Sequence, residues 1–387
     1  MSQLGYIEKL LDGVDVEWKK LSEIFNLKNG YTPSKSKKEF WENGQIPWFR
    51  MDDIRENGQI LNDSLQKVSK SAVKGGKLFP ADSIIISTSA TIGEHALVTV
   101  PFLANQRFTN LSLKPAYTNR FNMKFIFYYG FLLAEWCKNN TTVSSFASVD
   151  MNGFRELQIP IPPLNIQAEI VRILDTFTEL TAELTAELTA RQQQYAYYRE
   201  QLLTFEEREV EWKELGEVCE SISSGKNKIK SELGLYPVFG STGIIGRTDT
   251  KVYEKEQILV ARVGANAGRV NIATGEYDVS DNTLIVQNKD SIVLKFLYYY
   301  LVYINLNRFT KGAGQPLLTA GQLKKMLIPT PPISEQKRIV SILDKFDALT
   351  TSLTEGLPRE IALRQQQYEY YRDQLLSFPK PEVVAHD

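Results

Sequence analysis

Residues 191–205 read RQQQYAYYREQLLTF, and residues 364–378 read RQQQYEYYRDQLLSF, with twelve of the fifteen positions identical. The segments before them also match: IPIPPLNIQAEIVRILDTFTEL at 159–180 and IPTPPISEQKRIVSILDKFDAL at 328–349 share twelve of twenty-two positions. Further out, VEWKKL at 16–21 returns as VEWKEL at 210–215. Self-similarity of this kind indicates a tandem repeat, so the 387-residue chain is two copies of one unit. Each copy runs from a variable globular half into a common helical half.

The common halves have the pattern of long helices. Pro162-Pro163 and Pro331-Pro332 end the segment before each of them, because proline can neither complete a β-ladder nor sit inside a helix. Asn165 and Ser334 then occupy the positions expected of N-caps. Beyond them, apolar residues recur at alternating spacings of four and three, which predicts a coiled-coil seam buried against the matching helix. In the first copy the seam consists of Ile166, Ile170, Ile173, Phe177, Leu180 and Leu184.

Two irregularities distinguish the helical halves. The quartet Thr-Ala-Glu-Leu occurs twice in the first, at 181–184 and 185–188, and four extra residues locally unwind a coiled coil. The second contains Gly356 and Pro358, which we expect to kink or interrupt its helix.

The variable halves have the pattern of mixed α/β domains. Short apolar runs bounded by turn residues, such as 83–87 and 257–261, indicate strands, whereas 121–136 and 293–303 indicate helices. We therefore expect an α+β protein in which two globular mixed α/β domains are separated by two long antiparallel helices, a coiled coil, with pseudo-two-fold symmetry. The expected divisions are an N-terminal leader at 1–15, globular domains at 16–158 and 210–327, and helical spacers at 159–209 and 328–387.

Residues that catalysis or metal binding would need are scarce. The chain has only two histidines, His95 and His386, and two cysteines, Cys137 and Cys219, which is too few for a Cys/His zinc site. His95 is expected at a loop or strand end and His386 in the C-terminal tail. The sequence contains neither a phosphate-binding loop nor a nucleophile elbow, and the Gly-rich run 264–268 favours a tight turn. We therefore expect no catalytic residue, metal or cofactor in this chain.

The same composition bears on the compartment. No apolar run reaches the roughly 18 residues that a membrane helix needs. Residues 1–4 lack the basic and apolar stretches of a secretory signal, and two cysteines do not make a disulfide framework. These features predict a cytoplasmic protein that does not interact with a membrane.

Charge is unevenly distributed along the chain. The total is −1, from 45 basic and 46 acidic residues, which taken alone argues against binding to nucleic acid. The globular domains at 16–158 and 210–327 nevertheless carry +5 and +3, while the helical segments carry −5 and −2 and residues 1–15 carry −2. Basic domains joined by acidic helices fit contacts with DNA phosphates at two separated places.

Several short segments accompany the duplication. They are Gly30-Tyr31-Thr32-Pro33-Ser34, WENGQIPW at 41–48, Ala104-Asn105-Gln106-Arg107, and a Pro-Pro-x-x-x-Gln motif ending at Gln167 and again at Gln336. Together with the repeat they span essentially the whole chain, and the pattern resembles the specificity (S) subunit of Type I restriction–modification enzymes.

This resemblance implies two target-recognition domains, each reading one half of a bipartite site in double-stranded DNA. It implies helical regions that set the gap and dock two methyltransferase (M) subunits, and restriction/translocation (R) subunits that join this M2S1 core. S-adenosylmethionine, and ATP with Mg, would then serve the partner subunits, since no N-P-P-Y or D-P-P-Y methylase motif occurs here. The alternative is a stand-alone bipartite DNA-binding or architectural protein without enzyme partners.

Loops that combine Lys or Arg with Asn, Gln, Ser or Thr are the candidates for base readout, because Arg pairs with guanine and Asn or Gln with adenine. In the first globular domain these are Lys35, Lys37, Arg50, Ser89, Thr91, Asn105, Gln106 and Arg107. In the second they are Lys226, Lys228, Ser241, Thr242, Arg247, Arg262, Asn266, Arg269 and Gln315. For each of them, a solvated surface charge or a turn residue is an equally open interpretation.

Each repeated helical segment also carries three tyrosines within four residues. They are Tyr195, Tyr197 and Tyr198 in the first copy and Tyr368, Tyr370 and Tyr371 in the second. Three such residues cannot all face one seam, and aromatic residues are enriched at interfaces. Docking of the methyltransferase subunits and packing of the two helices on each other are the two open interpretations.

Overall fold

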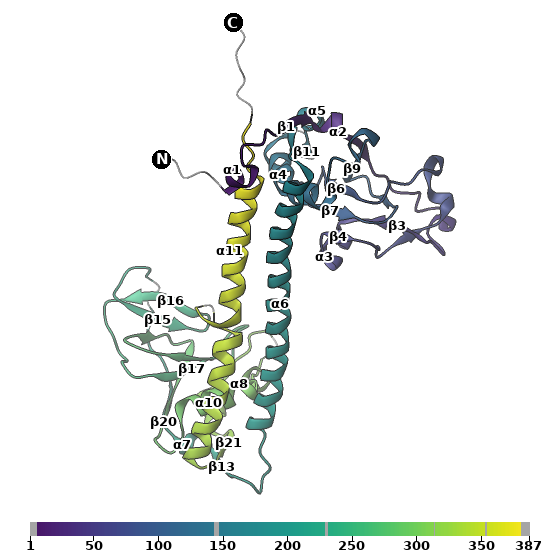
Figure 1. The fold of residues 1–387 in the computed structure, drawn as a ribbon. Coiled ribbons are helices and arrows are strands. Elements are labelled where there is room, and N and C mark those ends of the chain that lie inside the picture. Colours follow the sequence, from purple (N-terminus) through teal and green to yellow (C-terminus); the bar gives the residue numbers. More distant parts are fainter. Residues whose placement is uncertain (1–5, 143–146, 229–230, 313, 353, 381–387) are drawn as a thin grey trace. The chain divides into compact units, whose positions relative to one another are not determined.

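The computed structural model describes residues 6–142, 147–228, 231–312, 314–352 and 354–380, and the chain divides into two compact units (Figure 1). Unit 1 comprises Met1–Ala182 with Leu363–Asp387, and unit 2 comprises Glu183–Ala362. Each unit thus contains one globular part and portions of two helices, α6 (Leu164–Leu203) and α11 (Gly356–Leu376). His386 and the first five residues of the predicted leader lie outside the described residues.

The globular part of unit 1 is built from short strands and one longer helix, α4. Its helices are α1 (Tyr6–Leu11), α2 (Leu21–Ile24), α3 (Met51–Asn57), α4 (Met123–Asn139) and α5 (Met151–Glu156), with 3-10 turns η1 (Lys38–Phe40), η2 (Lys70–Ala72), η3 (Lys74–Gly76) and η4 (Pro115–Tyr117). Its strands are β1 (Glu17–Lys20), β2 (Phe25–Asn29), β3 (Ile46–Phe49), β4 (Ile60–Leu61), β5 (Lys67–Val68), β6 (Ser83–Ser87), β7 (His95–Val98), β8 (Leu103–Ala104), β9 (Phe108–Leu113), β10 (Thr141–Thr142), β11 (Ser148–Val149) and β12 (Gln158–Ile161).

Unit 1 has a five-stranded sheet in the order β2-β9-β6-β7-β4 and a three-stranded sheet in the order β5-β3-β8. The central strand β6 is apolar at three consecutive positions because both faces of its sheet are covered. Ile84 and Ile86 belong to the core that includes Phe125 of α4, whereas Ile85 belongs to a second core with Phe49 and Phe102. The predicted strand at 83–87 and the helix near 121–136 are therefore confirmed.

Unit 2 repeats this arrangement. Its shorter helices are α7 (Leu215–Val218), α8 (Leu294–Tyr303), α9 (Ala320–Lys324) and α10 (Ile333–Thr350), with η5 (Leu306–Phe309). Its strands are β13 (Glu211–Glu214), β14 (Cys219–Ser224), β15 (Tyr236–Gly240), β16 (Gly243–Thr248), β17 (Gln257–Ala261), β18 (Val270–Ala273), β19 (Asp278–Val279), β20 (Thr283–Asn288) and β21 (Leu327–Thr330).

The sheets of unit 2 run β14-β20-β17-β18 and β16-β15-β19, the orders found in unit 1 for β2-β9-β6-β7 and β5-β3-β8. The repeated edges pair in the same way, β1 antiparallel with β12 and β13 antiparallel with β21. The two variable halves therefore share one fold, although their sequences have little in common beyond their edges. This confirms two repeated domains of mixed α/β structure.

The long helices begin two residues earlier than expected. Helix α6 starts at Leu164 and α10 at Ile333, so Asn165 and Ser334 lie inside the first turn, and the prediction that they are N-caps is wrong. A buried glutamine in the first turn of each helix instead donates to a proline carbonyl, which caps no helical N–H. Gln167 Nε2 donates to Pro162 O at 2.7 Å, and Gln336 Nε2 donates to Pro331 O at 2.8 Å.

The same glutamines tie each long helix to the globular part of its unit. Gln167 Oε1 accepts the Asn122 N–H at the start of α4, and Gln336 Oε1 accepts the Val293 N–H at the start of α8. Buried amides need such partners, because an unsatisfied one costs about 1–3 kcal/mol. The Pro-Pro-x-x-x-Gln motif is therefore a structural clamp.

A second repeated contact lies about two turns further along each helix. In unit 1, Asp175 of α6 accepts hydrogen bonds from Lys124 Nζ and Tyr128 OH of α4, each at 2.7 Å. In unit 2, Asp344 of α10 accepts from Lys295 Nζ and Tyr299 OH of α8 at the same distance.

Within each unit the two helix portions pack antiparallel. In unit 1, Ile166 and Ile170 share a core with Leu375 and Leu376, and further along α6 Phe177 stacks on Tyr371 at 5.5 Å. Ile166, Ile170, Ile173 and Phe177 of the predicted seam thus pack in this unit. Leu180 and Leu184 are only half-buried, so the predicted burial is wrong for them. Leu174, outside the seam, is also buried because this part of α6 contacts α4 as well.

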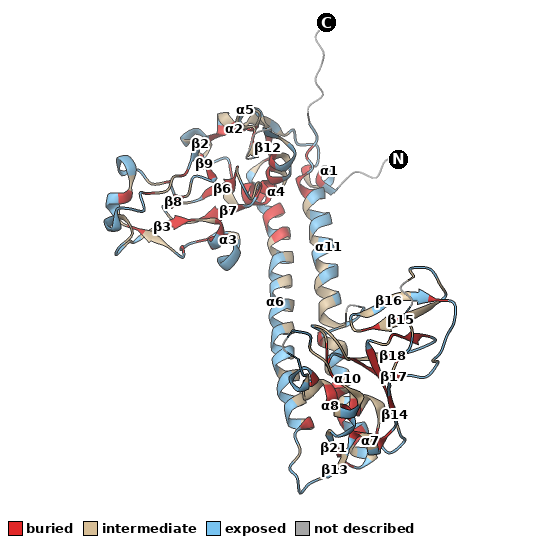
Figure 2. Cartoon of the chain, turned by 180° about the vertical axis from the view of Figure 1, so that it is seen from behind, coloured by how far each residue is buried: buried red, intermediate tan, exposed pale blue. Residues whose placement is uncertain are grey.

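In unit 2, the other end of α6 packs against α10. Leu203 shares a core with Ile339 and Leu343, and Tyr198 stacks on Phe346 at 5.6 Å. Figure 2 shows buried residues at the start of α6 and exposure along its middle, and none of the described residues 178–202 is buried.

The expected break in the second helical half is confirmed. Helix α10 ends at Thr350 and α11 begins at Gly356, whose φ is +74°. A Cβ at this position would lie 2.3 Å from Ala348 O, so only glycine fits the turn. Pro358 follows in the first turn of α11, where its missing N–H breaks no helical hydrogen bond.

Among the described residues, no helix combines the length and apolar character that crossing a membrane requires.

Candidate functional site

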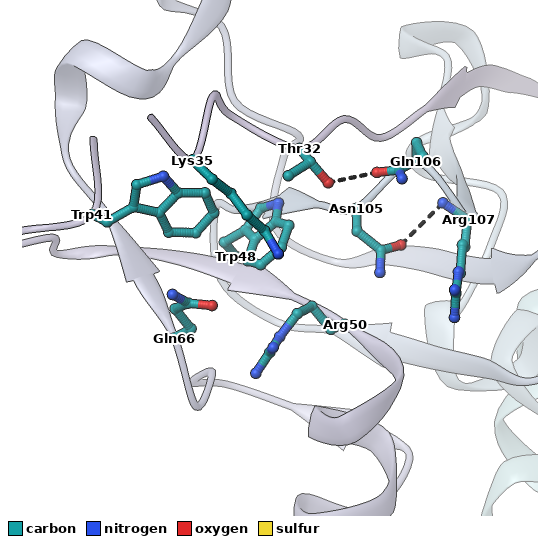
Figure 3. Close-up of a pocket in the computed structure, with 9 residues that line it drawn as sticks. All are labelled: Thr32, Lys35, Trp41, Trp48, Arg50, Gln66, Asn105, Gln106 and Arg107. Carbon is teal, nitrogen blue, oxygen red and sulfur yellow. Dashed lines mark hydrogen bonds between the residues drawn. The ribbon is translucent and has the colours of Figure 1, made fainter. Parts of the chain in front are cut away.

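Five of the predicted base-reading residues meet in one hollow of unit 1, with a volume of about 450 Å³ (Figure 3). Its lining consists of Thr32, Lys35, Trp41, Trp48, Arg50, Gln66, Asn105, Gln106 and Arg107. These described lining residues include three basic side chains and no acidic one. The hollow therefore presents guanidinium, ammonium and amide groups together.

Parallel pairing of two short strands positions this set. Strand β3 pairs with β8, with Trp48 opposite Leu103 and Phe49 opposite Ala104. Arg50 leaves the end of β3, and the turn 105–107 leaves the end of β8. Because parallel strands end at the same edge of a sheet, the two groups lie together.

The turn 105–107 is held through its backbone and its first two side chains. Asn105 Oδ1 accepts the Arg107 N–H at 3.0 Å, and the Thr32 hydroxyl donates to Gln106 Oε1 at 2.5 Å. Gln106 and Arg107 are both exposed. The Arg107 guanidinium thus extends from a fixed backbone into solvent.

Aromatic rings form one wall of the hollow. Trp41 packs edge-on against Trp48 with ring centroids 4.9 Å apart, and the Arg50 guanidinium lies 5.7 Å from the centroid of Trp48. The indole Nε1–H of Trp48 donates to Tyr31 O, which fixes the ring. Arg50 Nε is buried without a hydrogen-bond partner within the described protein, so this guanidinium has unused donor capacity.

The remaining candidates of unit 1 lie outside the lining of the hollow. The Lys37 ammonium lies 5.1 Å from the Phe40 ring centroid. Ser89 bridges to Ser148, and the Thr91 hydroxyl is buried without a partner in the described part of the chain. The structure thus gathers Lys35, Arg50 and the turn 105–107 but not these three residues.

In unit 2 the candidates are spread over several loops. Two of them lie beside the end of β19: Arg262 Nη1 donates to Asp281 O at 3.3 Å, and the Lys226 N–H donates to Val279 O at 3.1 Å. Ser241 and Thr242 form the connection between β15 and β16. Lys228, Arg269 and Gln315 are exposed and Asn266 is half-buried in their loops.

Arg247 has a structural role. Its Nε donates to Gly234 O at 2.7 Å and its Nη2 donates to Leu235 O at 2.6 Å. Its guanidinium therefore holds the backbone of the loop that precedes β15.

The repeated tyrosines divide into three kinds. Tyr195 stacks on Phe346 at 5.9 Å in unit 2, and Tyr368 packs against the core of unit 1. Tyr198 and Tyr371 are partly exposed and also stack within their units. Tyr197 and Tyr370 are 59% and 61% exposed. Intramolecular packing therefore accounts for the inner tyrosines but leaves the outermost pair at the surface.

The scarce titratable residues are buried. His95 opens β7 at a strand end, as expected, and its ring nitrogens lie 3.3 Å from Gly93 O and 3.1 Å from Phe127 O. Burial lowers the pKa of His95 to about 4. Burial also raises the pKa of the Cys137 and Cys219 thiols to about 12. Within the described residues, no group of three or more His, Cys, Asp or Glu side chains is placed to hold a metal.

Comparison with known proteins agrees with the duplicated geometry. The family model described as "Type I restriction modification DNA specificity domain" matches twice, at residues 13–191 and 207–363. The chain belongs to this family. It is 54% identical to the Type I restriction enzyme EcoprrI specificity subunit of Escherichia coli, over 92% of this chain and 93% of that protein.

Two further proteins extend the comparison. The EcoR124I/EcoR124II specificity subunit of E. coli is 35% identical over the full length of both chains. The crystal structure of a Type I S subunit from M. genitalium has a similar fold, with a TM-score of 0.55 at 18% identity, covering 95% of this chain and 98% of that one. The resemblance inferred from the repeat is thereby confirmed.

Four residues of the hollow were not singled out as base-reading candidates: Thr32, Trp41, Trp48 and Gln66. A signal for three of them was present, because Thr32, Trp41 and Trp48 belong to the short segments that carry the family resemblance. Gln66 gave no such signal, since it reaches the hollow only through the pairing of β5 with β3.

Proposed function

We propose that this specificity-family chain reads a bipartite DNA site, with each unit contacting one half. The observation that carries the proposal is the hollow of unit 1, where Lys35, Arg50 and the turn 105–107 converge at the ends of β3 and β8. Arg107 and Arg50 present donors suited to guanine, and Gln106 presents the amide that suits adenine. Lys35 suits a phosphate.

The distribution of charge supports contact with DNA at the globular parts. Their segments carry +5 and +3, whereas the helical segments carry −5 and −2. Phosphate contacts by the basic parts position the protein, and base contacts supply the sequence preference. The acidic helices would be repelled from the duplex.

We further propose that the helices set the gap between half-sites and dock two methyltransferase subunits. The exposed Tyr197 and Tyr370 lie at equivalent positions of the two repeats, so they offer two similar surfaces. Restriction/translocation subunits would join the resulting M2S1 core.

On this proposal the chain is a non-catalytic cytoplasmic subunit. The partner subunits would use S-adenosylmethionine, and ATP with Mg. The buried thiols of Cys137 and Cys219, with their raised pKa, are poor nucleophiles and suit a structural role.

Co-purification tests the proposal against a stand-alone DNA-binding protein. The tagged chain, co-expressed with its methyltransferase, should form a stable complex with two copies of that subunit. The complex should methylate adenine in DNA when given S-adenosylmethionine, and the isolated chain should not. A chain that binds DNA specifically but retains no methyltransferase would support the architectural alternative, and methyl transfer by the isolated chain would contradict the non-catalytic role.

A further inference from the structure

A turn in unit 2, residues 280–282, lies where unit 1 has the turn 105–107. In unit 1 the turn follows β8, which runs parallel to β3 with Phe49 opposite Ala104. In unit 2 residues 280–282 follow β19, which runs parallel to β15 with Phe239 opposite Val279. Each turn therefore leaves the same edge of the same small sheet in its own unit.

Four backbone hydrogen bonds define the turn in unit 1. The Asn105 N–H donates to Phe49 O at 3.0 Å, and the Phe108 N–H donates back to Asn105 O at 3.2 Å. The Arg107 N–H donates to the Asn105 side chain at 3.0 Å. The Thr88 N–H donates to Arg107 O at 2.9 Å, which ties the turn to the end of β6.

The turn in unit 2 makes the same four bonds. The Ser280 N–H donates to Phe239 O at 2.8 Å, and the Thr283 N–H donates back to Ser280 O at 3.2 Å. The Asn282 N–H donates to the Ser280 hydroxyl oxygen at 3.4 Å. The Arg262 N–H donates to Asn282 O at 3.0 Å, from the end of β17.

One glycine in each unit packs beneath its turn. A Cβ on Gly30 would lie 2.2 Å from Asn105 O, and a Cβ on Gly225 would lie 2.2 Å from Val279 O. Such distances exclude any larger residue unless the backbone moves. The bonds and the glycine together make position 281 equivalent to 106, and position 282 equivalent to 107.

The side chains on these equivalent backbones differ. Unit 1 carries Gln106 and Arg107, whereas unit 2 carries Asp281 and Asn282. Asn282 is exposed and Asp281 is half-buried. In the part of the chain that the structure describes, the Asp281 carboxylate and the Asn282 amide have no hydrogen-bond or ion-pair partner. Both groups are therefore free to contact a ligand.

The arginine beside each turn comes from a different strand in the two units. In unit 1, Arg50 extends from the end of β3, where unit 2 has Gly240 at the end of β15. In unit 2, Arg262 follows β17, where unit 1 has Thr88 after β6. Arg262 Nε, like Arg50 Nε, is buried without a partner among the described residues. One scaffold thus presents two different sets of hydrogen-bonding groups.

We propose that the turn 280–282 is the base-reading turn of unit 2, and that Asp281 and Asn282 determine its specificity. A carboxylate only accepts hydrogen bonds, so Asp281 selects a base that presents an amino group in the major groove, which is cytosine or adenine. Asn282 adds a donor and an acceptor. This inference rests on the proposed function, because it transfers the reading role of the turn 105–107 to the second unit.

Substitution in the full complex tests the inference. Asp281→Ala and Asn282→Ala chains, co-expressed with the methyltransferase, are mapped by long-read methylation sequencing. Each variant should relax one base position in one half-site, lowering discrimination between about fivefold and a hundredfold, and should leave the other half-site unchanged. Asp281→Asn, which keeps the shape of the side chain, should change the preferred base at the same position as Asp281→Ala.

Asp290→Asn is the matched control, because Asp290 is an exposed acidic residue at the opposite end of β20 from Asp281. It should leave both half-sites unchanged. The inference is overturned if all three turn variants keep both half-sites intact, or if they lower methylation of every sequence equally.

Gln106→Ala separates this inference from the proposed function. If Gln106→Ala relaxes the half-site that the Asp281 and Asn282 variants leave intact, the proposed function and the inference about the turn 280–282 are both supported. If it changes neither half-site while Asp281→Ala changes one, the reading role of unit 1 fails and that of unit 2 remains. A wild-type chain without any bipartite motif would contradict the proposed function itself.

Discussion

Arg107 has its backbone held on both sides by hydrogen bonds, while its guanidinium is exposed at the rim of the hollow. A long charged side chain on a fixed backbone loses less conformational freedom on binding than one on a mobile loop. Gln106 is held at its side chain instead, because its amide oxygen accepts the Thr32 hydroxyl. The site thus combines a fixed backbone with side chains that line the hollow.

Replacing Arg107 with Ala should relax one base position in one half-site and leave the other half-site unchanged. The expected cost at that position is about 1–3 kcal/mol, the usual value of a bidentate contact with guanine. Binding assays on oligonucleotides with single-base changes measure it. Arg155→Ala is the control, since Arg155 is an exposed arginine at the end of α5 outside the lining of the hollow. Equal weakening on all sequences would show that Arg107 contacts a phosphate instead.

The buried His95 should make the stability of the protein depend on pH. Its pKa is about 4 in the folded protein, below the ordinary value of 6.5, because it is buried. Between these values the unfolded state binds a proton that the folded state does not, so stability is complete above pH 6.5 and falls as the pH drops. From pH 6.5 to 5 the free energy of unfolding should fall by about 2 kcal/mol.

Urea unfolding at several pH values, compared with a His95→Gln variant, checks this prediction. The variant should lose most of the pH dependence in this range, whatever its own stability. Equal pH dependence in both proteins would show that other groups cause the decline.

Single residues also mark how far the sequence could predict the site. Asn105, Gln106 and Arg107 were predicted because their side-chain chemistry suits base edges. Asp281 was not, because its position follows only from backbone hydrogen bonds that match those of unit 1. Backbone bonds of this kind leave almost no trace in the side chains, apart from Gly30 and Gly225.

At the scale of elements, the helices were the most predictable part, since their apolar spacing and proline boundaries are local signals. The interruption before α11 was anticipated from Gly356 and Pro358 for the same reason. The helix starts were mispredicted because each helix begins directly after its Pro-Pro pair. Pro163 O and Pro332 O accept the first helical hydrogen bonds, from the N–H groups of Gln167 and Gln336.

Deleting residues 185–188 should shorten the gap between the half-sites by about one base pair. Four helical residues contribute about 6 Å of rise and a net rotation of about 40°. One base pair contributes about 3.4 Å and roughly 34–36°. Methylation mapping should therefore find both half-sites unchanged and the gap reduced. Glu187→Gln, which removes the ion pair with Arg191 but keeps the helix length, should preserve the gap. An unchanged gap after the deletion would contradict the role of the helices in spacing.

Replacing Tyr197 and Tyr370 with Ala should weaken methyltransferase binding, because both rings are exposed and each packs against the next tyrosine of its own helix. We expect at least a tenfold loss of affinity, about 1.4 kcal/mol, with an unchanged melting temperature. Titration of the purified subunits measures the affinity. Ile244 is a similarly exposed apolar residue on β16, and an Ile244→Ala chain should bind the methyltransferase with unchanged affinity. A double variant with full affinity would place the docking surface elsewhere.

At the scale of the whole molecule, each unit is completed by the repeat that belongs to the other copy. Residues 364–378 end the second copy in sequence, yet Leu375 and Leu376 pack in the core of unit 1. Residues 191–205 end the helical half of the first copy, and Leu203 packs in the core of unit 2. This reciprocal exchange explains why the sequence is most alike in these segments, since each must fit an equivalent partner surface.

The net charge of the whole molecule, −1, conceals the positive charge of the two globular parts. The duplication, the charge and the family could all be read from the sequence. The strand order that the variable halves share could not, because few of their residues match.

Long-read methylation sequencing tests whether this chain reads a bipartite site, with the wild-type chain and its methyltransferase co-expressed in a host without other adenine methylation. We predict one methylated motif made of two short specified half-sites separated by an unspecified gap of constant length. A single uninterrupted motif, or methylation that does not depend on this chain, would show that the two units do not each read one half-site.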